Sequence, residues 1–73
     1  MGMKTTVKVR FNASKENFEK FGNGMYLIYL PFEEDQDSWK IIAGLLSRKT
    51  GTPVGRIEFA GKDVKGNYVY EII

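Results

Sequence analysis

The 73-residue sequence contains no cysteine and no histidine. The chain therefore has no disulfide and no thiol nucleophile, and it lacks the thiolate and imidazole ligands on which most zinc sites depend. The side chain that most often changes its protonation near neutral pH is absent as well. Ser14, Ser38, Ser47 and several threonines remain as nucleophiles, but no histidine is present to activate them. The sequence predicts a protein that is not an enzyme.

Signals for cofactors, metals and membranes are also scarce. Gly22-Asn23-Gly24 is a turn sequence and not a phosphate-binding loop, so no cofactor is expected. The acidic residues of 33–37 lack the spacing of a calcium loop, and we expect them to serve a helix N-terminus and not a metal. The longest apolar run, 25–32, is far shorter than the roughly 20 residues of a membrane-spanning helix. No secretory signal is visible at the N-terminus.

Length and composition favour one small domain. Hydrophobic residues make up 42% of the chain and aromatic residues 14%, which is enough for a compact core. We expect residues 1–73 to form one domain, with Met1 and Gly2 as a candidate cloning remnant ahead of a start at Met3. A domain without disulfides needs no oxidising compartment, which favours the cytoplasm.

Hydrophobic periodicity predicts a set of strands. Residues 5–11 alternate between apolar and polar side chains, which is typical of a strand with one buried and one wet face. Residues 13–22 are mostly polar and predict a loop or a short irregular strand, and Asn23-Gly24 predicts a tight turn. Residues 25–30 are apolar on both faces, as in a central strand. Two further strands are expected, at 56–60 and 68–73.

One amphipathic helix is expected between the second and third of these strands. Its apolar stripe has helical spacing and consists of Trp39, Ile42, Ala43 and Leu46, widened by Ile41 and Leu45. Asp35 or Asp37 can cap its start, Arg48 and Lys49 suit its negative end, and Gly51 and Pro53 are typical of its termination. The order is β-loop-β-α-β-β. It predicts a two-layer α+β domain with the helix on a mixed or mostly antiparallel sheet, against Val7, Val9, Phe11, Ile57 and Phe59.

From residue 25 onward, the order of these elements and the residues that separate them resemble the YggU-like family of small domains of unknown function. The matching features are the proline-containing loop Leu30-Pro31-Phe32, the Gly51-x-Pro53 step after the helix and the apolar–Glu–apolar strand Ile57-Glu58-Phe59. The family's Gly-Lys-Ala-Asn run at the helix entry is replaced here by acidic residues. The resemblance implies an α+β fold and assigns no activity.

A second resemblance competes with the first. Residues 57–62, Ile-Glu-Phe-Ala-Gly-Lys, look like a strand and turn of ubiquitin-like β-grasp domains, and they follow a helix and a Gly-x-Pro step as in those domains. No diglycine tail follows Ile73, so the resemblance does not extend to a conjugated modifier or a sulfur carrier. We favour the YggU-like resemblance.

Aromatic residues suggest one candidate function. A single helix covers only one sheet face, so we expect the tyrosines either to pair across strands or to form a contact surface on the other face. That surface would consist of Tyr26, Tyr29, Tyr68 and Tyr70. The favoured hypothesis is a non-catalytic interaction module that binds a protein partner, or a second copy of itself, through this sheet face.

Basic residues suggest the alternative, a weak RNA- or DNA-binding module with a tyrosine as stacking platform. Residues 1–24 carry five basic and two acidic groups, and 48–73 carry five basic and three acidic groups. The candidate patch consists of Lys8, Arg10, Arg56 and Lys62. Lysines also protect edge strands against aggregation, and that role would account for the same residues on the first strand without any ligand.

Overall fold

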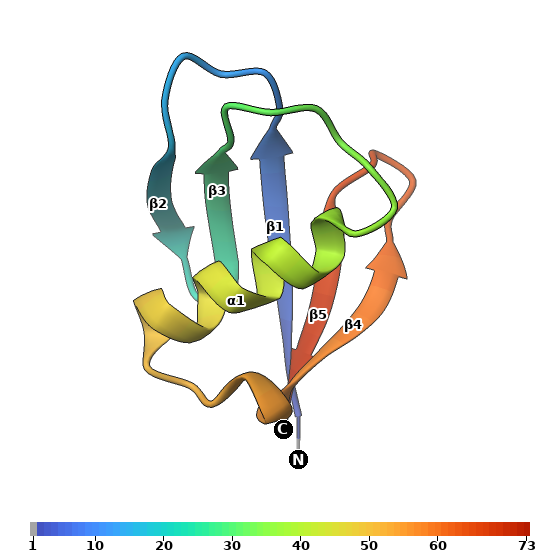
Figure 1. Cartoon of the computed structure of the whole chain (residues 1–73). Helices are drawn as coiled ribbons and strands as arrows, with labels where there is room; N and C mark the ends of the chain where they lie inside the picture. The colour runs from blue at the N-terminus through green and yellow to red at the C-terminus, as the bar shows by residue number, and fades with distance from the viewer. Residues whose placement is uncertain (1) are drawn as a thin grey trace.

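The computed structural model describes residues 2–73 and shows one helix packed on a five-stranded mixed sheet (Figure 1). Met1, half of the candidate cloning remnant, lies outside the described residues. The strands are β1 (Met3–Arg10), β2 (Asn17–Gly22), β3 (Met25–Tyr29), β4 (Ile57–Lys62) and β5 (Tyr68–Ile72). The helix α1 spans Ser38–Thr50, and the short 3-10 helix η1 spans Val54–Arg56. The predicted α+β class is confirmed.

The sheet has the strand order β2-β3-β1-β5-β4, so β1 is its middle strand. β1 runs parallel to β3 and antiparallel to β5. β2 forms one edge in the segment for which the sequence predicted a loop or a short irregular strand, and its register shifts between Lys20 and Gly22. β4 forms the other edge and carries a similar irregularity between Phe59 and Gly61. Both edges are therefore interrupted by bulges, which discourage further strand pairing.

The turn at Asn23-Gly24 joins β2 to β3, as predicted. Gly24 has a φ of 69°, and a Cβ on it would lie 2.7 Å from the carbonyl oxygen of Lys4. The carbonyl of Gly24 accepts a hydrogen bond from the amide of Thr6 at 2.7 Å. Glycine is required here because the turn presses its backbone directly against β1.

The helix ends as its sequence signals indicate, but neither Asp35 nor Asp37 caps its start with a side-chain bond to a helix amide. Asp35 Oδ1 accepts the amide N–H of Asp37 at 2.8 Å, and Ser38 Oγ accepts the amide N–H of Asp35 at 2.9 Å. Asp37 occupies the cap position but makes no side-chain cap bond, so the local bonding runs through Asp35 and Ser38. At the other end Gly51 adopts the left-handed conformation, and its amide donates to the carbonyl of Ser47.

The core lies between α1 and the sheet face that points toward it. Ile42, Ala43, Leu45 and Leu46 of the predicted stripe are buried. Trp39 and Ile41 are not: they are 36% and 42% exposed because they lie at the margin of the stripe. The Trp39 ring still stacks on Phe59, with 5.6 Å between ring centroids. Within residues 2–73 no helix is long and apolar enough to cross a membrane.

Candidate ligand-binding surface

The predicted tyrosine surface does not form, because three of its four members face the helix. Tyr26, Tyr68 and Tyr70 share the covered face with the core residue Val7, which pairs with Tyr26 on one side and Tyr68 on the other. All three are buried, and Tyr70 has no exposed surface. The interpretation that they formed a contact surface on the other face is wrong. Strand alternation assigns them to the face that α1 covers.

Hydrogen bonds make burial tolerable for two of these tyrosines. The hydroxyl of Tyr70 donates to the carbonyl of Trp39 at 2.6 Å, and the hydroxyl of Tyr68 donates to Glu34. Burial, and secondarily the bond to Glu34, raises the pKa of Tyr68 to about 12, and burial raises the pKa of Tyr70 as well. Both rings are therefore neutral members of the core.

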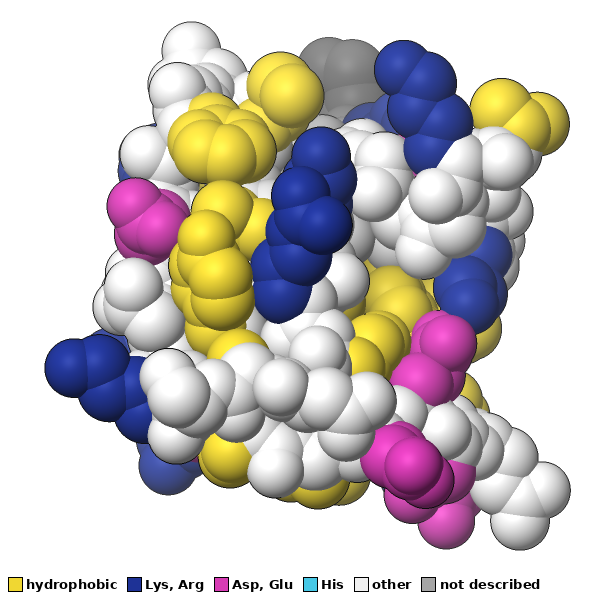
Figure 2. All heavy atoms as spheres, turned by 90° about the horizontal axis from the view of Figure 1, so that it is seen from above, with side chains coloured by type: hydrophobic (Ala, Val, Ile, Leu, Met, Phe, Trp, Pro, Cys, Tyr) yellow, Lys and Arg dark blue, Asp and Glu magenta, His cyan; other side chains and the backbone are white. Residues whose placement is uncertain are grey.

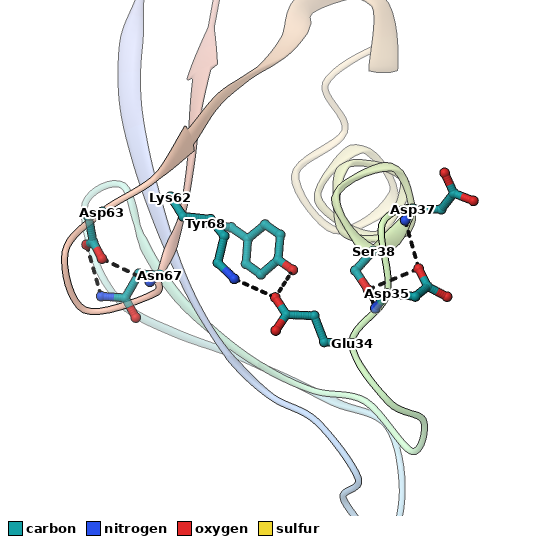
Figure 3. A network of polar contacts seen from close by, with 8 residues as sticks. All are labelled: Glu34, Asp35, Asp37, Ser38, Lys62, Asp63, Asn67 and Tyr68. Atoms are coloured by element: carbon teal, nitrogen blue, oxygen red, sulfur yellow. Dashed lines mark hydrogen bonds and ion pairs between the residues drawn. The ribbon is translucent and has the colours of Figure 1, made fainter.

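Lys62 does not join the candidate basic patch. Its ammonium Nζ lies 2.6 Å from Glu34 Oε2 and 5.0 Å from the centre of the Tyr68 ring (Figure 3). The Lys62 ammonium, together with the hydroxyl of Tyr68, lowers the pKa of Glu34. These three side chains tie the loop before α1 to β4 and β5 on the covered side of the sheet. Lys62 has a structural partner there.

Arg56 is separated from the patch as well. It lies in η1, at the end of the sheet where the chain terminates, and its Nε donates to the carbonyl of Ile73 at 2.6 Å. Arg10 lies at the opposite end of β1 (Figure 1). The prediction that four basic residues form one patch is wrong for Arg56 and Lys62. The sequence pattern does not specify the order of the strands in the sheet, and that order separates these two residues from Lys8 and Arg10.

Lys8 and Arg10 do lie together, on the sheet face that no helix covers. Both are exposed, and they pair in register with Leu27 and Tyr29 of the neighbouring strand β3. Because β1 is the middle strand of the sheet, protection of an edge does not explain its basic residues. Leu27 is only 8% exposed although no helix covers it, and its in-register neighbours are Lys8 and Glu19.

A shallow hollow of about 220 Å³ lies beside Tyr29. The loop between β1 and β2 provides one wall, and β2 and β3 provide the rest; the lining residues are Ala13, Ser14, Lys15, Asn17, Glu19 and Tyr29. Tyr29 itself is half-buried. Its ring therefore stands between the basic side chains of β1 and a polar hollow at the sheet edge.

The charges on the molecule are segregated. In Figure 2, basic side chains stand beside an apolar patch, and most of the visible acidic side chains gather at a separate corner. On the uncovered face, Glu58 and Glu71 pair with each other on β4 and β5, and Lys4 is the β1 neighbour of Glu71. The end of the face that carries Lys8 and Arg10 is therefore the more basic one.

The acidic loop before α1 is occupied by internal contacts. Glu34 holds Lys62 and Tyr68, and Asp35 bonds to the backbone at the start of the helix (Figure 3). Asp37 faces Lys40 at 3.7 Å. Within residues 2–73 no three acidic side chains are arranged to hold a metal ion.

The sequence alone indicated Lys8, Arg10 and Tyr29 but not Asn17 and Glu19. Both side chains precede the Asn-Gly turn and lie on the uncovered face, opposite Tyr29 and Leu27 respectively. The hairpin signal at Asn23-Gly24, had it been combined with strand alternation, would have placed them beside β3. It could not show that the preceding loop closes a hollow around them.

No protein-family model, no curated protein and no solved structure matches this chain. The resemblances to YggU-like and β-grasp domains stay predictions.

Proposed function

We propose that this protein is a non-catalytic binding module whose uncovered sheet face binds single-stranded RNA or DNA weakly, in the cytoplasm. One observation carries the proposal: Lys8 and Arg10 stand on the middle strand, beside the ring of Tyr29 in register on β3. Basic side chains that follow a backbone and an aromatic ring that stacks on a base are the two elements of single-strand recognition.

The arrangement predicts low affinity and steep salt dependence. Lys8 and Arg10, with Lys15 at the hollow, offer contacts to three phosphates at most. Each phosphate contact with a single strand contributes about −0.7 to the slope of log affinity against log salt. The slope should therefore be roughly −2, which means a loss of about 10–20-fold for a fourfold rise in salt. Stacking on Tyr29 should add about 1–3 kcal/mol.

Titration of the protein with a short unstructured RNA, followed by amide chemical shifts, tests the proposal. At low salt we expect shifts in β1 and β3 around Lys8, Arg10 and Tyr29, with α1 unaffected. The shifts should shrink as salt approaches physiological concentration. The absence of any shift at low salt would contradict the proposal, and so would shifts centred on the helix.

Two variants with matched controls sharpen this test. Arg10→Gln should weaken binding and flatten the salt slope by about 0.7, whereas Arg48→Gln, which removes an exposed arginine from the helix, should leave the slope near its original value. Tyr29→Leu should cost most of the stacking energy, and Tyr29→Phe should retain it. If Arg10→Gln and Arg48→Gln lowered the affinity for RNA equally, the RNA would be attracted by the net charge of the protein and not by a defined site.

A protein partner on the same face is the second candidate, and its simplest form is self-association. It is favoured by Met25, which is 52% exposed on β3, and by the half-buried Val69, whose side chain also points to the uncovered face. Two copies could join these apolar side chains around a two-fold axis. Sedimentation at high concentration tests this: a Met25→Lys change should abolish any dimer, and a strictly monomeric profile of the unmodified protein contradicts self-association.

A further inference from the structure

We propose that the hollow beside Tyr29 receives one base of the bound strand and selects bases with an exocyclic amino group over uracil and thymine. This inference rests on the proposed function, because a strand must first lie across β1 and β3. At about 220 Å³ the hollow is smaller than pockets for drug-sized ligands, and a single base is the part of a nucleotide strand that suits it.

Polar groups around the hollow are left unused by the fold. Asn17 Oδ1 accepts the amide N–H of Phe18 at 2.9 Å, which leaves Nδ2 as a donor. Within residues 2–73, neither this Nδ2 nor the carboxylate of Glu19 makes a hydrogen bond or ion pair, and the same holds for the Tyr29 hydroxyl. A donor and a strong acceptor thus stand beside an aromatic ring in one hollow.

The charges decide which part of a nucleotide enters. Lys15 and Glu19 both line the hollow, so their opposite charges offset each other there, whereas Lys8 and Arg10 on the other side of β3 attract phosphate without a facing carboxylate on β1 or β3. A strand bound to this face therefore runs its backbone over β1 and turns a base toward β2. The base stacks on Tyr29, and its polar edge faces Asn17 and Glu19.

The same groups distinguish cytosine from uracil, two bases of nearly equal size and stacking area. Cytosine offers an amino group that donates to Glu19, next to a ring nitrogen and a carbonyl that accept from Asn17 Nδ2. Uracil's single donor, its ring N–H, lies between two carbonyl oxygens, so a carboxylate aimed at it meets an acceptor on each side. Mismatched acceptors of this kind leave polar groups unpaired, which lowers affinity.

Fluorescence anisotropy with labelled oligocytidine and oligouridine of equal length, at low salt, tests the preference. We expect oligocytidine to bind roughly fivefold more tightly, the lower end of the range for a paired hydrogen-bond contact to a base, because the hollow is open to solvent. Glu19→Gln should reduce the ratio toward one, since an amide presents a donor as well as an acceptor. Loss of the negative charge should at the same time strengthen binding of both oligonucleotides. Glu58→Gln, on β4 across the sheet, is the matched control and should leave the ratio unchanged.

The outcomes separate the two proposals. Equal binding of both oligonucleotides by the unmodified protein overturns base selection and leaves the nucleic-acid proposal standing. A cytidine preference that survives Glu19→Gln overturns the assignment to this hollow. If neither oligonucleotide binds at low salt, both proposals fail together.

Discussion

The two faces of the sheet come from the same strands but differ in what they do. On the covered face, aromatic and aliphatic side chains such as Tyr70, Ile28 and Val7 pack under α1 with no exposed surface. On the other face the same strands present Lys8, Arg10 and Glu71 to solvent. Alternation along a strand assigns each side chain to one face, and only then does its chemistry determine its role.

Tyrosine illustrates this most clearly. Tyr70 and Tyr29 lie on β5 and β3, the two strands that flank β1, yet Tyr70 bonds to the helix and Tyr29 lines the hollow on the uncovered face. A tyrosine is thus a core residue or a ligand platform according to its register. The comparison predicts that damage to the covered face affects stability, whereas damage to the open face affects binding.

The largest effect is expected at the helix side of the core. Leu46 has no exposed surface, so Leu46→Ala should lower the free energy of unfolding by about 2–5 kcal/mol through lost burial and a new cavity. Met25→Ala on the open face should change it by less than about 1 kcal/mol. Urea unfolding of both variants provides the measurement. A loss below about half a kcal/mol in Leu46→Ala would show that α1 does not pack as described.

Alkaline pH should lower the free energy of unfolding through ionisation of a tyrosine on the covered face. The pKa of Tyr68 is raised in the folded state from 10.0 to about 12, so its contribution to stability is complete below about pH 10 and is lost as pH rises toward 12. Two pKa units correspond to about 2–3 kcal/mol. Urea unfolding at a series of pH values should show this decline, and Tyr68→Phe should make it shallower. A stability that stays constant up to pH 12 would contradict the burial of this ring.

The smallest expected effect is the difference in stability between removing the hydroxyl of Tyr70 and removing that of Tyr29. Tyr70→Phe removes the donor to the Trp39 carbonyl and should cost about 1 kcal/mol. Tyr29→Phe removes a hydroxyl that makes no hydrogen bond within residues 2–73, and it should leave stability nearly unchanged. Thermal unfolding of the two variants measures the difference. Equal effects would mean that the two faces do not differ in the way described.

Much of the fold could be predicted because its signals are local. The helix ends at Gly51 because a left-handed residue is needed there, and the turn at Gly24 is marked by its Asn-Gly pair. The candidate site was predicted only in part. Lys8, Arg10 and Tyr29 were identified by type, whereas Arg56 and Lys62 were included although their partners, Ile73 and Glu34, lie far along the chain.

The sequence by itself determined the α+β class, the helix and the two-faced character of β1, because alternation, capping and turn residues act over a few positions. Only the tertiary structure decided which strands are neighbours and which sheet face α1 covers. The strand order and the choice of covered face explain why Tyr68 is buried, why Lys62 pairs with Glu34 and why Tyr29 lies beside Arg10. They depend on contacts between segments distant in the chain, which local patterns of a few residues do not specify.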